Sequence, residues 1–150
     1  MAHALNGGAK RVGGRLAFVW TTAKVLLGYR DQHVTISVDG GPAENLAITN
    51  YALCNARYFG GGMRVAPAAE VDDGLLDATI WSGFSLRDFV LQCRALYDGT
   101  HVHAPGTTVF RARRVEAMSA DRVLLDVDGE AAGRLPIRVE VLHRALRFDG

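Results

Sequence analysis

Two groups of acidic residues in this sequence have types and spacing suited to chemistry. The first group contains Glu70, Asp72, Asp73 and Asp77. Carboxylate and backbone carbonyl oxygens are the ligands that hard cations such as Mg²⁺ prefer. The spacing does not match an EF-hand loop, and Asp73-Gly74 is also a turn signal. From the residues alone, solvated acids in a tight turn are therefore favoured over a metal site.

The second group consists of Asp128 and Glu130, which flank Gly129 after the largely apolar run 123–127. The simpler interpretation is a hairpin turn with exposed acids. The alternative is a catalytic carboxylate at the end of a strand. A hydroxyl that attacks a phosphoryl group must lose its proton, and a positioned aspartate can accept it. In that case the base would be one of the two acids that flank Gly129.

Consecutive glycines at positions 60–62 open a loop that also contains Pro67 and Asp73-Gly74. Each of these residues sets the backbone, which is typical of a loop with more than a connecting role. The glycines do not form a phosphate-binding P-loop, because no Gly-Lys-Ser/Thr follows and no helix is expected to begin there. A tight strand crossing that admits no side chain is the plainer explanation.

Histidines and arginines give weaker signals. His101 and His103 are expected on one face of a strand, and two alternating histidines can bind zinc. No third ligand stands at a suitable spacing, so packed or solvated histidines are favoured. Arg111, Arg113 and Arg114 form a short basic run. It is typical of a solvated strand edge, and a weak contact with anionic lipid headgroups is the minor alternative.

The elements that must position these residues are mainly strands. Helical spacing predicts a helix over 15–28, and a capping box at Ser85 predicts a second helix that ends at Gly99. Alternating or continuous apolar residues predict the strands, at 34–38, 46–55, 75–81, 108–112, 115–119, 123–128, 135–142 and 145–148. The pattern predicts a mainly β (α+β) fold, an antiparallel β-sandwich with two packed helices.

Length and composition predict one ordinary globular domain. The chain has 150 residues, 49% hydrophobic and 22% charged, with a formal net charge of +1. This balance gives no electrostatic footprint for nucleic acid. Cys54 and Cys93 stand in apolar surroundings, which favours reduced thiols and a cytoplasmic location over a disulfide. No apolar run approaches the length of about 18 residues that a transmembrane helix needs.

Three motifs in order carry a family resemblance: FGGGM at 59–63, DDGLLD at 72–77 and DGE at 128–130, with Asn55 before the first. From about Gly13 to Phe148 the chain resembles the C-terminal domain of the diacylglycerol kinase and sphingosine kinase-type lipid kinases, especially the bacterial soluble ones. The resemblance implies the C-terminal lobe of a two-lobe kinase, likewise mostly a β-sandwich.

The resemblance also implies roles for individual residues. It makes Asp128 the proposed general base, with Glu130 as its partner or its rival. It implies a structural Mg²⁺ held by the Asp73 carboxylate and by the backbone carbonyls of Glu70 and Leu75. Because the glycine segment borders the cleft between the lobes in that family, it implies a substrate-facing role for three further residues, Asn55, Gly61 and Gly62.

The sequence departs from the family in one respect. The family's nucleotide-binding lobe carries a GGDGT-like signature upstream, and this chain has none. We therefore expect residues 1–150 to be a single C-terminal domain, with 1–12 as a loose leader, and the isolated chain to be nearly inactive. ATP as co-substrate is expected mainly on the missing lobe.

The expected partners are that upstream lobe, a lipid with a free hydroxyl and a transient membrane surface, without nucleic acid. A homodimer is also compatible with the sequence. The expected location is cytoplasmic or peripheral at the membrane. Two other functions remain open: a non-catalytic β-sandwich module that binds a lipid or a partner, and the C-terminal half of an NAD kinase.

Overall fold

The computed structural model describes residues 30–145. The helix expected over 15–28 and nearly all of the strand expected over 145–148 lie outside the described residues. The strands are β1 (Gln32–Val38), β2 (Glu44–Ile48), β3 (Asn50–Cys54), β4 (Leu76–Trp81), β5 (Thr107–Ala112), β6 (Arg114–Met118), β7 (Leu124–Val127), β8 (Glu130–Arg134) and β9 (Ile137–Glu140). The helical elements are α2 (Leu86–Asp98) and the 3₁₀ turn η1 (Thr100–His103).

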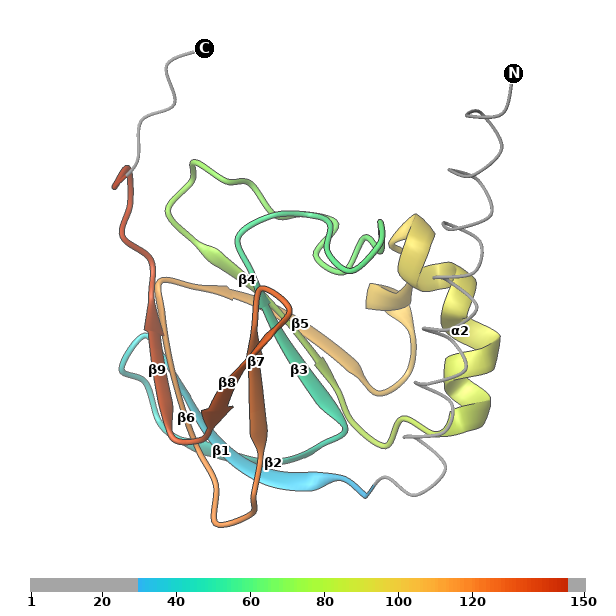
Figure 1. Ribbon diagram of the computed structural model, residues 1–150, viewed down its shortest axis with the longest axis horizontal. Helices are drawn as coiled ribbons and strands as arrows, with labels where there is room; N and C mark the ends of the chain where they lie inside the picture. Colours follow the sequence, from blue (N-terminus) through green and yellow to red (C-terminus); the bar gives the residue numbers. More distant parts are fainter. Residues whose placement is uncertain (1–29, 146–150) are drawn as a thin grey trace, which may run out of the picture.

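The strands form two antiparallel sheets and a separate hairpin. One sheet has the order β2-β1-β6-β9 and the other the order β3-β4-β5, while among the described strands β7 pairs only with β8. The helix α2 and the turn η1 lie together at one end of the described fold, on the side away from β9 (Figure 1). The expected antiparallel β-sandwich is confirmed, with one of the two expected helices inside the described residues.

Apolar side chains fill both faces of the three-stranded sheet. One cluster joins the two sheets and includes Val34, Ile36, Val115 and Ile80. The second cluster lies on the other face, where Trp81 contacts residues of α2 and of the loop before β4. Because both faces are covered, all six residues of β4 are buried.

The strand expected over 46–55 is wrong as a single element. The run breaks at Thr49, and its halves β2 and β3 belong to different sheets. The Thr49 hydroxyl donates to Asp31 over 2.6 Å and accepts from the Phe84 backbone N–H over 2.9 Å. These contacts hold the residue at the corner where the chain passes from one sheet to the other. The strand buried at the centre of its sheet is β4.

The helix α2 begins and ends as expected. The Ser85 hydroxyl accepts from the Asp88 backbone N–H, and the Asp88 carboxylate accepts from the Ser85 backbone N–H, which is a full capping box. The Ser85 hydroxyl also donates to the Asp88 carboxylate, and this hydrogen bond, together with the one from the Ser85 backbone N–H, lowers the pKa of the Asp88 carboxyl. At the other end, Gly99 has a φ of 84° and donates its N–H to the Ala95 carbonyl.

The hairpin β7–β8 contains a strand that the sequence did not predict. All five residues of β8 are exposed, so no apolar alternation marks it. The turn was predicted: Asp128 and Gly129 have φ values of 53° and 89°, the two positive angles that a type I′ turn requires. The Gly129 N–H also donates to the Asp126 carboxylate over 2.9 Å.

Candidate functional site

The long connection between β3 and β4, residues 55–75, contains the FGGGM motif and the first four residues of DDGLLD, and is called the 55–75 loop here. Its glycines form a turn closed by two backbone hydrogen bonds of 3.0 Å between Phe59 and Met63. Gly60, Gly61 and Gly62 all have positive φ. A Cβ at Gly61 or Gly62 would meet nothing within 4 Å. A Cβ at Gly60 would lie 2.7 Å from the end of the Met63 side chain. The expected tight strand crossing is therefore wrong at Gly61 and Gly62, where the backbone angle and not crowding requires glycine.

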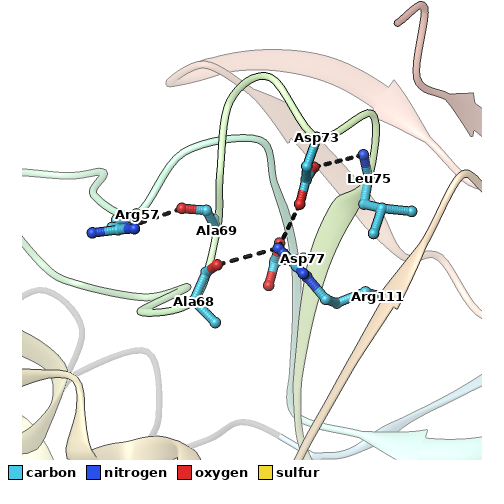
Figure 2. Close-up of polar contacts among 7 residues, drawn as sticks. All are labelled: Arg57, Ala68, Ala69, Asp73, Leu75, Asp77 and Arg111. Atoms are coloured by element: carbon cyan, nitrogen blue, oxygen red, sulfur yellow. Dashed lines mark hydrogen bonds and ion pairs between the residues drawn. The ribbon is translucent and has the colours of Figure 1, made fainter.

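One arginine gathers the carboxylates at the end of the loop. The Arg111 guanidinium donates to the Asp73 carboxylate over 2.6 Å and to the Asp77 carboxylate over 3.2 Å. It also donates to the Ala68 carbonyl over 3.2 Å. Figure 2 shows the guanidinium between the two aspartates, with the Leu75 backbone N–H donating to the other oxygen of Asp73. This arrangement ties the loop to β4 and β5.

The acidic residues around Arg111 stabilise the positive charge of its guanidinium. Its hydrogen bond with Asp77 raises the pKa of the guanidinium, and the nearby charges of Asp77, Asp73 and Glu70 add to this. The side chain of Asp77 is only 11% exposed, against 40% for Arg111. The arginine thus reaches from solvent to neutralise a nearly buried carboxylate. Sequence reasoning had assigned Arg111 to a solvated edge and missed this contact.

Two side chains, Thr79 and His101, hold the middle of the 55–75 loop. The Val65 carbonyl lies 3.1 Å from the Thr79 hydroxyl of β4 and 3.1 Å from Nε2 of His101. Nδ1 of His101 lies 3.2 Å from the Ala95 carbonyl of α2, and its ring stacks on Trp81. His101 therefore ties the loop to the helix. The prediction that His101 and His103 share a strand face is wrong, because both lie in η1.

The contacts of Asp73 bear on whether the expected magnesium site can hold an ion. Asp73, Glu70 and Leu75 offer one carboxylate and two carbonyl oxygens, a hard donor set that suits Mg²⁺. Each Asp73 oxygen accepts one hydrogen bond, so each keeps a lone-pair site. Within residues 30–145, no three His, Cys, Asp or Glu side chains gather closely enough to hold a metal ion. Arg111 is the cation paired with Asp73 in this arrangement.

The predicted catalytic residues occupy the β7–β8 hairpin. Asp128 lies in the turn and Glu130 is the first residue of β8, and both are exposed. Asn55, Gly61 and Gly62 are likewise exposed, in the 55–75 loop. The hairpin and the loop are thus two separate places in the fold that present predicted site residues to solvent.

A pocket of about 410 Å³ lies next to the hairpin. Its volume is in the range of small-molecule sites, about 300–1,000 Å³. Apolar residues from both sheets and the hairpin dominate its lining, among them Val34, Leu53, Leu125 and Leu135. Asp128 also lines it, whereas no residue of the 55–75 loop does. The pocket therefore places a predicted catalytic carboxylate beside an apolar cavity.

Comparison with known proteins identifies the family. A profile described as "YegS C-terminal NAD kinase beta sandwich-like domain" matches residues 2–148. The chain belongs to this family. Within the YegS C-terminal family, a protein from Shewanella frigidimarina named "Probable lipid kinase YegS-like" is 31% identical over 122 residues, 81% of this chain and 39% of the relative. The diacylglycerol kinase of Bacillus subtilis is 26% identical, over 87% of this chain and 43% of the relative.

Solved structures agree on the fold of this YegS-type domain. The crystal structure of a diacylglycerol kinase from Bacillus anthracis matches with a TM-score of 0.63 at 20% identity, over 93% of this chain and 46% of that one. At this low sequence identity, the structural match shows a shared fold and does not show a shared function. The chain spans less than half the length of each of these relatives. The family resemblance expected from the three motifs is therefore confirmed.

The two cysteines of the domain are free thiols, as expected. Cys54 and Cys93 are both half-buried. Burial raises the pKa of the Cys54 thiol to about 11, and the charge of Asp77 adds to this effect.

Within residues 30–145, no helix is long and apolar enough to cross a membrane.

Proposed function

We propose that this domain is the acceptor-side lobe of an ATP-dependent lipid kinase. Family membership and the kinase names of the relatives support a kinase parent. In this proposal an upstream lobe holds ATP, and this domain holds the lipid whose hydroxyl is phosphorylated. The acceptor is a diacylglycerol-like or sphingoid lipid, reached at a membrane surface from the cytoplasm.

The observation that carries the proposal is the position of Asp128 at the apolar pocket. A lipid alcohol has an apolar body and one reactive polar end, so its site needs an apolar cavity with a base at the mouth. Leu135 in the pocket lining is buried, whereas Asp128 is exposed. The carboxylate therefore belongs to the open part of the lining, where a hydroxyl could meet a nucleotide held by another lobe.

In the proposed reaction the Asp128 carboxylate accepts the proton of the lipid hydroxyl. The hydroxyl oxygen forms a bond to the γ-phosphorus of ATP, the bond from that phosphorus to the β-phosphate oxygen breaks, and ADP leaves. Positioning and charge stabilisation dominate phosphoryl transfer, so an ordinary carboxylate in the right place suffices. Glu130 follows the turn and is the alternative base.

Magnesium belongs to this proposal as a structural ion at Asp73, with the carbonyls of Glu70 and Leu75. Such an ion competes with Arg111 for the Asp73 carboxylate. Asp73→Asn is expected to abolish a magnesium-dependent rise in melting temperature, and Arg111→Met to enlarge it. At a hundredfold excess over Kd, the ion should add about 2.7 kcal/mol to the unfolding free energy.

Thermal melts of this chain with and without Mg²⁺ measure this effect. Asp72→Asn, which changes an exposed acid next to Asp73, is the matched control and should keep the rise. If the unmutated protein shows no rise up to millimolar Mg²⁺, the magnesium site is rejected.

A transfer assay tests the proposed function. The two-lobe protein that carries this domain is offered labelled ATP, magnesium and a total lipid extract, with this chain alone as the control. A labelled lipid from the two-lobe protein and none from the chain alone is the expected result, and the mobility of the product identifies the acceptor. A folded, ATP-binding protein that labels no lipid would instead direct attention to soluble acceptors such as NAD.

One observation favours the alternative of a non-catalytic binding module. Both residues of the Asp128-Gly129 turn have positive φ, which an Asp-Gly pair adopts readily. Folding alone would thus explain the DGE motif. A two-lobe protein that binds lipid in the pocket but transfers no phosphate would support the module.

A further inference from the structure

The tip of the β7–β8 hairpin, residues 126–130, depends on contacts within the hairpin. Among residues 30–145, no backbone hydrogen bond joins β7 or β8 to either sheet, and the two strands pair only with each other. Their pairing is also irregular, because the register shifts between Leu125 and Asp126. The regular part of the hairpin therefore ends just before the tip, and the tip needs a contact of its own to keep one conformation.

Asp126 supplies this contact. Val127 pairs with Glu130, so Asp128 and Gly129 are the two central residues of the turn, and their N–H groups take no part in the strand ladder. The Asp126 carboxylate accepts a hydrogen bond from the Gly129 N–H over 2.9 Å. It thereby gives a free backbone donor a partner, and it closes the turn around Asp128.

The direction of the Asp128 carboxylate follows from this turn. In the described part of the protein, the carboxylate makes no hydrogen bond or ion pair of its own. The backbone alone therefore sets where it points, at a φ of 53° that residues other than glycine adopt only uncommonly. Without the contact from Asp126, the turn could relax to other backbone angles, and the carboxylate would move with it.

We propose that Asp126 is a positioning residue, which holds the Asp128-Gly129 turn so that the Asp128 carboxylate points at the attacking hydroxyl. This inference rests on the proposed function for the role of Asp128 as the base. A general base must come within about 2.6–3.2 Å of the oxygen whose proton it accepts, and a misplacement of about 1 Å can lower the rate about 10²-fold. Asp126 takes no proton in this assignment and acts only through Asp128.

Two substitutions separate the hydrogen bond from the charge. Asp126→Ala removes the acceptor, whereas Asp126→Asn removes the charge and keeps an oxygen that can accept from Gly129. In the two-lobe protein, Asp126→Ala should lower kcat about 10- to 100-fold with little change in the KM for ATP, because a misplaced base weakens only the transition state. Asp126→Asn should recover most of the lost turnover. If Asp126→Asn is as slow as Asp126→Ala, the hydrogen bond is not what matters, and the proposal is overturned.

A double-mutant cycle tests whether Asp126 acts through Asp128. In a two-lobe protein that already carries Asp128→Asn, adding Asp126→Ala should lower turnover by no more than about twofold, because no base remains to be positioned. A further loss as large as the one in the wild-type background would show that Asp126 acts independently of Asp128, and it would overturn the proposal.

Amide exchange in this chain alone measures the contact without turnover. The Gly129 N–H should exchange with water about five- to tenfold faster in Asp126→Ala than in the wild type, the range expected for the loss of one net hydrogen bond. The melting temperature should stay nearly unchanged, because Asp126 is exposed. An unchanged exchange rate, or a clear fall in the melting temperature, would overturn the proposal.

These results distinguish a failure of the inference from a failure of the proposed function. Phosphate transfer that is lost in Asp128→Asn and unchanged in Asp126→Ala would retain the kinase and reject the role of Asp126. No phosphate transfer to lipid by the unmutated two-lobe protein would reject the kinase and the positioning role with it, and faster exchange of the Gly129 N–H in Asp126→Ala would then retain only the contact within the turn.

Discussion

Asp128→Asn is expected to lower phosphate transfer by the two-lobe protein about 10²- to 10⁴-fold, the usual contribution of a general base. The amide cannot accept the proton of the attacking hydroxyl. The substitution should leave the fold intact, because asparagine tolerates the positive φ of 53° at this position and Asn-Gly is a favoured type I′ turn. Turnover numbers and melting temperatures of the two proteins measure both expectations.

Glu130→Gln is the matched control for this experiment. It changes the other exposed acid of the DGE motif and should lower turnover far less if Asp128 is the base. If Glu130→Gln lowers turnover more than Asp128→Asn does, Glu130 is the base instead. Near-wild-type turnover in both variants would remove the hairpin from the chemistry and strengthen the binding-module alternative.

The largest effect on stability is expected from His101→Ala. His101 is 1% exposed, its two ring nitrogens face the Val65 and Ala95 carbonyls, and its ring stacks on Trp81. Truncation removes these contacts and leaves a cavity beneath the 55–75 loop. We expect the free energy of unfolding to fall by about 2–4 kcal/mol. Urea denaturation of this chain measures the change.

His103→Ala provides the matched control, because His103 belongs to the same 3₁₀ turn but is exposed. Its effect should stay within about 0.5 kcal/mol. His101→Phe separates packing from hydrogen bonding, since it restores a ring without ring N–H donors. Equal stability of the His101→Ala and His103→Ala variants would contradict the assigned role of His101.

Features encoded by neighbouring residues were predicted well from the sequence. The capping box at Ser85, the helix end at Gly99 and the turn at Asp128-Gly129 each depend on a few consecutive residues. The break at Thr49 was missed because its partners, Asp31 and Phe84, are distant in sequence. The exposed strand β8 has no apolar pattern that could reveal it.

The same distinction applies to the candidate site. The sequence motifs identified the carboxylates, because acidic residues in a turn are visible as a local pattern. The pairing of Arg111 with Asp73 and Asp77 depends on the register of β4 against β5, in which Asp77 lies opposite Arg111. The apolar pocket depends on packing between the two sheets and the hairpin, which no spacing rule predicts.

Among the described strands, β7 and β8 pair only with each other, so the length of this hairpin sets how far Asp128 extends from the sheets. Adding two residues to each strand would carry the turn about 7 Å outward and keep every side chain on its present face. Adding one residue to each strand would move it about half as far and exchange the faces. The distance between the carboxylate and an opposing lobe could therefore be adjusted by strand length, with the DGE sequence unchanged.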